Sequence, residues 1–173
     1  MIRAASLIAL AMLGACTDRS GTDGSESDFA SRVGAGNAAA SPAVATPGDN
    51  AAVKGPPPAG ANVFALEKLG DIGGVDLGPR AGGCSFSVAG VEMLIAAGPV
   101  DPALPGKAVV RLGGKLVQLD TPPGGLAAIK AGTSFTGEGF AIRVQPTAAA
   151  KGIMTITDAT GANRQTAGDW TCA

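Results

Sequence analysis

The chain of 173 residues contains no histidine and no tyrosine, and it has only one tryptophan and three cysteines. Without histidine, Ser-His and Cys-His nucleophilic sites are excluded, together with most zinc, copper and non-haem iron sites. No Asp-rich loop supplies the oxygen ligands that calcium needs, and no Gly-rich loop leads into a helix that could hold a phosphate. We therefore expect neither a metal nor a cofactor.

An excess of charge of one sign is also lacking. Thirteen basic residues are balanced by 14 acidic ones, and no two basic residues are adjacent, so nucleic acid is not an expected partner. The carboxylates of the C-terminal half stand singly in turns or at strand ends: Glu92, Asp101, Asp120, Glu138, Asp158 and Asp169. A glycosidase needs two facing carboxylates. We predict that the protein is not an enzyme, and a small hydrolase using two of these carboxylates is the catalytic alternative.

The first fifteen residues have the layout of an export signal. Arg3 precedes an apolar run over residues 4–13, which is followed by the small residues Gly14 and Ala15. A helix that crosses a bilayer needs roughly 20 apolar residues, so the run is too short for one. We interpret residues 1–15 as a signal peptide, the alternative being a buried N-terminal helix.

The sequence Leu13-Gly14-Ala15-Cys16 resembles the lipobox of bacterial lipoproteins. The resemblance implies cleavage before Cys16 and attachment of acyl chains such as palmitate, whereas ordinary cleavage after Ala15 would leave a free thiol. Two or three acyl chains anchor a protein stably in a membrane, but one does so only marginally. Because Thr17, and not Asp, follows the cysteine, the resemblance implies the outer membrane with the protein facing the periplasm. Asp18 one position later leaves the inner membrane open.

Residues 16–60 are predicted to form a disordered tether after the lipidated cysteine. Of residues 17–60, 27 of 44 are Ala, Gly, Ser or Pro, and the large apolar residues are only Phe29, Val33, Val44 and Val53. Such a segment buries too little apolar area to offset its ordering entropy. The tether could place the domain away from the membrane, or its length could be unconstrained.

Residues 61–80 are predicted to form a short helical or irregular lead-in. Val63, Leu66 and Leu69 have helical spacing, and Gly70 would end the helix.

Residues 81–173 have the pattern of an all-β domain. Short apolar runs with period-two stretches are separated by Gly and Pro clusters, which indicates a small antiparallel barrel or sandwich of about seven or eight strands. The strands are predicted near residues 84–89, 91–97, 107–112, 115–120, 133–136, 140–145, 153–157 and 165–172.

The clearest predicted unit is a hairpin that turns at Gly113-Gly114, because glycine tolerates the positive φ of a tight turn. A two-residue turn sets the register. It pairs Leu112 with Lys115, Val110 with Val117 and Ala108 with Leu119 on an apolar face that should point to the core. Arg111 with Leu116, Val109 with Gln118, and Lys107 with Asp120 then lie on the outer face, the last as an exposed charge pair.

Two further strands show which face is buried. Phe140, Ile142 and Val144 alternate with polar or small residues, including Arg143 on the solvent-exposed side, and Trp170 shares a face with Cys172.

After Cys16 is acylated, Cys84 and Cys172 remain as an even pair. In an oxidising compartment such a pair predicts a disulfide, the alternative being two buried thiols.

Residues 71–173 resemble a group of small alphaproteobacterial envelope proteins without an assigned activity. The resemblance rests on Asp71-Ile72, Gly82-Gly83-Cys84-Ser85-Phe86, Gly114-Lys115-Leu116-Val117-Gln118-Leu119 and Gly168-Asp169-Trp170-Thr171-Cys172. The chain also resembles the membrane-bound c-type lysozyme inhibitors, which are lipid-anchored small barrels with a disulfide. Their inhibitory Ser-Gly-x-x-Tyr and Lys-Gly segments correspond to residues 131–135 and 138–139, where Ala131, Phe135 and Glu138 replace the Ser, Tyr and Lys.

The sequence thus predicts a non-enzymatic, lipid-anchored envelope protein whose disulfide-closed β domain binds a periplasmic protein, a glycan or peptidoglycan. Inhibition of a cell-wall-degrading enzyme is the alternative. The sequence selects no ligand-binding residues, but an exposed Phe135 or Phe140 would indicate a binding surface.

Overall fold

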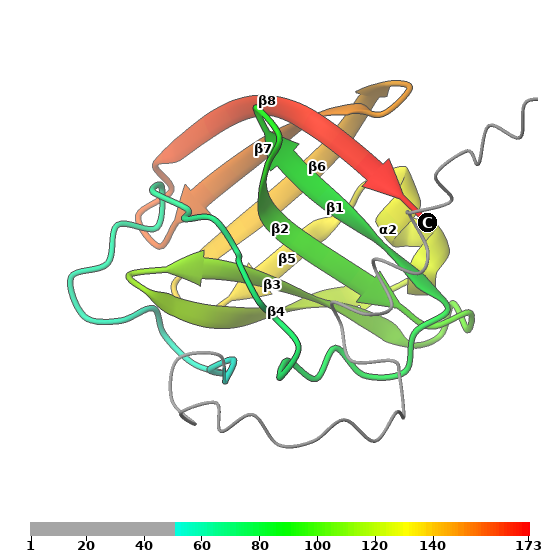
Figure 1. Cartoon of the computed structure of the whole chain (residues 1–173), viewed down its shortest axis with the longest axis horizontal. Helices are drawn as coiled ribbons and strands as arrows, with labels where there is room; N and C mark the ends of the chain where they lie inside the picture. Colours follow the sequence, from blue (N-terminus) through cyan, green and yellow to red (C-terminus); the bar gives the residue numbers. More distant parts are fainter. Residues whose placement is uncertain (1–50) are drawn as a thin grey trace, which may run out of the picture.

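The computed structural model describes residues 51–173, so the predicted signal peptide, Cys16 and most of the predicted tether lie outside the described residues. Eight antiparallel strands form a closed barrel in which each strand pairs with the next and β8 returns to β1 (Figure 1). The strands are β1 (Gly82–Val88), β2 (Val91–Gly98), β3 (Pro105–Leu112), β4 (Lys115–Pro123), β5 (Ser134–Gly137), β6 (Phe140–Ala148), β7 (Lys151–Asp158) and β8 (Asn163–Cys172). The predicted all-β barrel is confirmed.

The barrel interior is filled by side chains that alternate along each strand. On β6, Phe140, Ile142 and Val144 are buried in the core, and Arg143 between them is exposed, as their alternation predicts. Trp170 of β8 packs in the same cluster, and Cys172 lies against it. These inward side chains fill the barrel interior.

The β3–β4 hairpin has the predicted register at every pair. Gly113 and Gly114 form the turn with φ angles of 54° and 76°, and Val110 pairs with Val117 as expected. The predicted inner face points into the barrel core. Lys107 and Asp120 are register partners, but the carboxylate of Asp120 also lies 3.9 Å from the Lys54 ammonium.

The outer face of this hairpin differs from the prediction, because Val109 and Leu116 are fully buried there. They are covered by the strap, which we define as residues 51–77 and which crosses the outside of the barrel (Figure 1). Leu69, Ile72, Val75 and Leu77 of the strap pack on this outer face and form a second apolar cluster.

Of the two alternatives predicted for residues 61–80, the structure has the irregular one, because this segment consists of turns and extended chain and contains no helix. The three residues that suggested a helical face do not pack together. Val63 and Leu66 pack against the barrel core, whereas Leu69 belongs to the outer cluster. Burial on two separate surfaces requires an extended path, and this overrides the local helical spacing.

The strap also forms backbone hydrogen bonds with strands of the barrel. The Val53 N–H donates to the Leu116 oxygen at 2.8 Å, and the Gln118 N–H donates to the Val53 oxygen at 3.1 Å. The chain therefore joins the barrel before residue 60, where the tether was predicted to end. Farther along, the Glu67 N–H donates to the Arg111 oxygen at 3.0 Å. The Arg111 side chain donates from Nε to the Leu69 oxygen, also at 3.0 Å.

A short helix, α2 (Gly125–Ala131), lies against one end of the barrel and was not predicted (Figure 1). Ile129 is fully buried in the core, and a Cβ atom at Gly106 would lie 2.6 Å from its Cδ1 atom. Glycine at position 106 therefore lets the helix approach the sheet.

Phe64 of the strap also packs on the core, with the guanidinium carbon of Arg164 6.0 Å from its ring centre.

Candidate functional site

The predicted disulfide joins Cys84 of β1 to Cys172 of β8. The two residues are partners in the ladder that closes the barrel, and their Cα atoms are 4.0 Å apart. The bond therefore fixes the one seam that joins strands from opposite ends of the domain. Cys16, the predicted lipidation site, lies outside the described residues.

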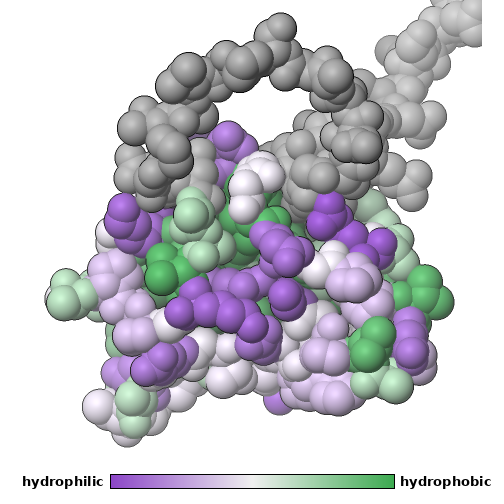
Figure 2. Space-filling model, turned by 90° about the horizontal axis from the view of Figure 1, so that it is seen from below, coloured by the Kyte–Doolittle hydropathy of each residue, from purple (hydrophilic) through white to green (hydrophobic). Residues whose placement is uncertain are grey.

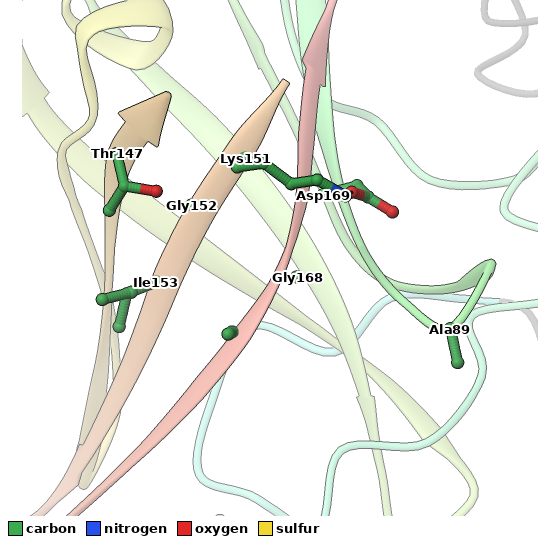
Figure 3. A pocket seen from close by; sticks show the side chains of 8 residues that line it. Ala89, Thr147, Lys151, Gly152, Ile153, Gly168 and Asp169 are labelled. Carbon is green, nitrogen blue, oxygen red and sulfur yellow. The ribbon is translucent and has the colours of Figure 1, made fainter. Parts of the chain in front are cut away.

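An open groove of about 710 Å³ crosses the outer surface beside this seam (Figure 3). It is lined by Ala89, Thr147, Lys151, Gly152, Ile153, Ala167, Gly168 and Asp169. Ile153 and Ala167 are cross-strand partners and form an apolar floor. The Lys151 side chain reaches across β8 and forms an ion pair with Asp169, so the groove has both charges at its rim.

Two glycines, Gly152 and Gly168, face each other in the ladder behind this groove. Their missing side chains would point inward, because Met154 and Trp170, two positions farther along, are in the core. A Cβ atom at Gly168 would lie 2.3 Å from the Ser87 oxygen and 2.7 Å from the Phe86 ring. β8 can approach β1 this closely because Gly168 has no side chain.

The carboxylates that we considered for catalysis lie on separate elements. Glu92 is on β2, Asp101 in the β2–β3 loop, Asp120 on β4, Glu138 in the β5–β6 turn, Asp158 at the end of β7 and Asp169 on β8. Within residues 51–173, no three Cys, Asp or Glu side chains gather where they could hold a metal ion. That same part of the chain contains no helix of the length and hydropathy needed to cross a membrane.

Asp158 organises the turn between β7 and β8. Its Oδ1 atom accepts hydrogen bonds from the Thr160 hydroxyl at 2.7 Å, the Thr160 N–H at 2.9 Å and the Ala162 N–H at 3.0 Å. The bond from the Thr160 hydroxyl is the main cause that holds the pKa of Asp158 below its ordinary value.

The lowered pKa of Asp158 predicts a pH-dependent contribution to stability. A carboxylate with a lower pKa in the folded state stabilises the protein above its unfolded pKa, and this contribution is lost as the pH falls through the folded value. Asp158→Ala should therefore lower the urea midpoint at pH 6, and the difference from the parent should shrink below about pH 4. Asp158→Asn keeps the acceptor oxygen without the charge and serves as the control. If the urea midpoints of Asp158→Ala and the parent differ by the same amount at every pH, the ionised carboxylate of Asp158 is not the stabilising group.

The two aromatic residues whose exposure would indicate a binding surface are in the core. Phe135 is 0% exposed and Phe140 is 4% exposed. Residues 131–135, which correspond to an inhibitory segment of the lysozyme inhibitors, run from the end of α2 into β5. The Phe135 ring therefore cannot contact a partner unless the barrel opens.

Apolar side chains are exposed at a different place, in the β2–β3 loop. Val100 is 81% exposed and Leu104 is 45% exposed. The loop is ordered by Asp101, whose Oδ1 accepts the Ala103 N–H at 2.8 Å. The signal that could have identified it is a pair of apolar residues among the turn-forming Pro99, Asp101 and Pro102.

Figure 2 shows one face of the molecule, on which hydrophilic residues cross the centre and hydrophobic residues form separate patches. On this face the surface therefore presents small apolar patches bordered by polar groups.

Comparison of the chain with protein-family models, with curated proteins and with solved structures finds no match.

Proposed function

We propose that the protein is a non-enzymatic lipoprotein, anchored through Cys16 in the outer membrane and facing the periplasm, whose barrel binds an envelope partner through its outer surface. The filled barrel interior carries this proposal. The core residues of the strands occupy the inside, whereas the groove lined by Ile153 and Ala167 lies outside. Small barrels with filled interiors recognise partners through surface strands and loops.

The disulfide supports the proposed compartment. Disulfides persist in oxidising spaces such as the periplasm and are rare in the cytosol. The Cys84–Cys172 bond is therefore consistent with export by the predicted signal peptide. Acylation of Cys16 would keep the exported domain at the membrane, because two or three buried acyl chains give stable anchoring.

The anchor is tested by replacing Cys16. In cells supplied with labelled palmitate, Cys16→Ala should abolish incorporation of the label and release the protein from the membrane fraction. Thr17→Ala serves as the control and should keep the label. Thr17→Asp should also keep the label but move the protein to the inner membrane. Continued labelling of Cys16→Ala would remove the anchor from the proposal.

Partner binding is tested in intact cells with a photocrosslinking residue placed at several exposed surface positions, including Val100 and Arg143. A discrete adduct that requires Cys16 would support binding at the membrane, and the absence of adducts from every position would contradict it.

The inhibitor alternative is tested by adding the purified protein to lysozyme. We expect no inhibition through residues 131–135, because Phe135 is buried.

A further inference from the structure

The strand β8 has an edge that extends past the end of its neighbour. β8 spans ten residues, but β1 pairs only with residues 169–172 of it. β1 ends at Val88 and turns at Ala89, whose φ angle is 50°. Among the described residues 51–173, residues 163–167 therefore have a neighbouring strand on the β7 side only.

The hydrogen-bond pattern shows which backbone groups lie on this edge. The Trp170 N–H donates toward the β6–β7 turn, to the Ala150 oxygen, whereas the Ala173 N–H donates to the Gly83 oxygen next to β1. Successive residues of a strand point their N–H and C=O groups to opposite sides. The backbone N–H and C=O groups of Gln165 and Ala167 thus point to the side of β8 on which β1 would lie if it continued past Val88. Both residues are exposed, and within residues 51–173 their register partners in the sheet lie on β7 alone.

Comparable edges elsewhere in the barrel are paired by extended chain. β4 and β5 share a single residue pair, Asp120 with Thr136, and beside it Val53 of the strap bonds to β4. At the β2–β3 seam, Glu67 bonds to β3 and Leu69 bonds to β2. At two places in this barrel, therefore, an extended segment forms backbone hydrogen bonds with strands that are only partly paired with their neighbours.

The edge adjoins the groove on the outer face. Ala167 belongs to both, and its cross-strand partner Ile153 provides a half-buried apolar surface. A strand added beside Ala167 would alternate its side chains inward and outward, and one outward side chain would lie near this surface. In Figure 3 the β1–β2 turn carrying Ala89 bends away from β8 beside this groove.

We propose that residues 163–167 bind an extended peptide segment of another protein, which adds as a strand to β8 and places an apolar side chain in the groove at Ile153. This inference rests on the proposed function and specifies its site and class of partner. A second copy fits less well, because its own edge would bring the polar side chains of Asn163 and Gln165 to the apolar floor.

The test uses the mature full-length chain carrying Cys16→Ala, labelled with ¹⁵N, and a capped peptide Lys-Thr-Val-Thr-Val-Thr-Lys. Binding should slow amide hydrogen exchange at Gln165 and Ala167 by about tenfold. Exchange at Thr166, whose N–H faces β7, should not change. The same peptide with N-methylated valines keeps its side chains but loses two backbone donors, so it should not bind.

Two variants separate the backbone of this edge from its side chains. Gln165→Pro removes one edge N–H and leaves the β7 ladder intact, because proline is tolerated on an edge where the N–H is unpaired. It should abolish binding, whereas Gln165→Ala should retain it. Unchanged amide shifts along β7 would verify that Gln165→Pro is folded.

The proposal is overturned if the peptide perturbs neither Gln165 nor Ala167 up to about 1 mM, or if its effects centre on Val100 and Leu104. It is also overturned if the edge amides are protected before peptide is added. Protection in a dimer would assign the edge to a second copy, and protection in a monomer would assign it to the chain's own N-terminal residues. Crosslinks in cells from other surface positions would still support partner binding in each of these cases.

Discussion

Replacing Cys84 and Cys172 together by alanine should lower the free energy of unfolding by about 4 to 5 kcal/mol in the chain-entropy view of disulfides. The bond joins residues separated by 88 positions, so its loss frees a long loop in the unfolded chain. The predicted loss of free energy is a large share of the total stability of a small domain. The measurement is urea unfolding of the double variant and of the reduced parent, which should agree.

The same experiment has a matched cysteine control. Cys16→Ala should leave the urea midpoint unchanged in the unlipidated chain, because it removes no bond of the barrel. A thiol assay on the denatured parent without Cys16 should detect no free thiol. If the double variant unfolds at the same urea concentration as the parent, the closing seam is stabilised mainly by its β-ladder.

Gly168→Ala should destabilise the barrel by about 1 to 3 kcal/mol, the usual cost of overfilling a packed site. The added methyl group would meet the Ser87 oxygen at 2.3 Å and the Phe86 ring at 2.7 Å. A flexible ring can move, but the backbone oxygen belongs to a ladder that also contains the disulfide. Phe86→Leu should therefore relieve only part of the cost when the two changes are combined.

Gly152 provides the control for this prediction, because it is the cross-strand partner of Gly168. A Cβ atom there would meet the Gln145 oxygen at 3.2 Å and the Trp170 Cβ at 3.3 Å, which are less severe contacts. Gly152→Ala should cost clearly less than Gly168→Ala in the same urea titration. Equal costs would show that the close contact at Gly168 does not determine the effect, because the lower flexibility of the unfolded chain favours folding in both variants.

The strands and one complete register could be predicted because they depend on local rules. A two-residue turn at Gly113-Gly114 leaves only one way to pair the flanking residues, and the structure has that pairing. Each predicted strand lies within three residues of the observed bounds. The alternation that marks the inner face of β6 depends on the same period of two.

The strap and α2 could not be predicted because their conformations depend on distant surfaces. Leu69 and Ile72 lie on an outer sheet face that exists only after β2, β3 and β4 have assembled. In α2, seven residues follow a Pro- and Gly-rich stretch, and such a short helix needs tertiary contacts, here those of Ile129. Local propensity gives little information about either segment.

The groove and the exposed edge depend on the stagger between β1 and β8, which no local pattern encodes. The sequence shows that Trp170 and Cys172 share a face, and this was predicted. It does not show that the β1 ladder stops at Asp169 and leaves Gln165 and Ala167 without a second neighbouring strand among residues 51–173. The aromatic side chains of Phe135 and Phe140, whose exposure the sequence leaves open, fill the barrel.

The disulfide also determines how the domain would carry a mechanical load. A pull on the chain ahead of residue 51 would act first on the two hydrogen bonds between Val53 and β4, then peel the rest of the strap. Fully straightened, residues 53–81 would span about 90 Å. At Cys84 the force would then pass through a covalent bond to Cys172 and so into β8. The strands from β2 to β7 would bear little of the tension between a membrane anchor and a partner held on β8.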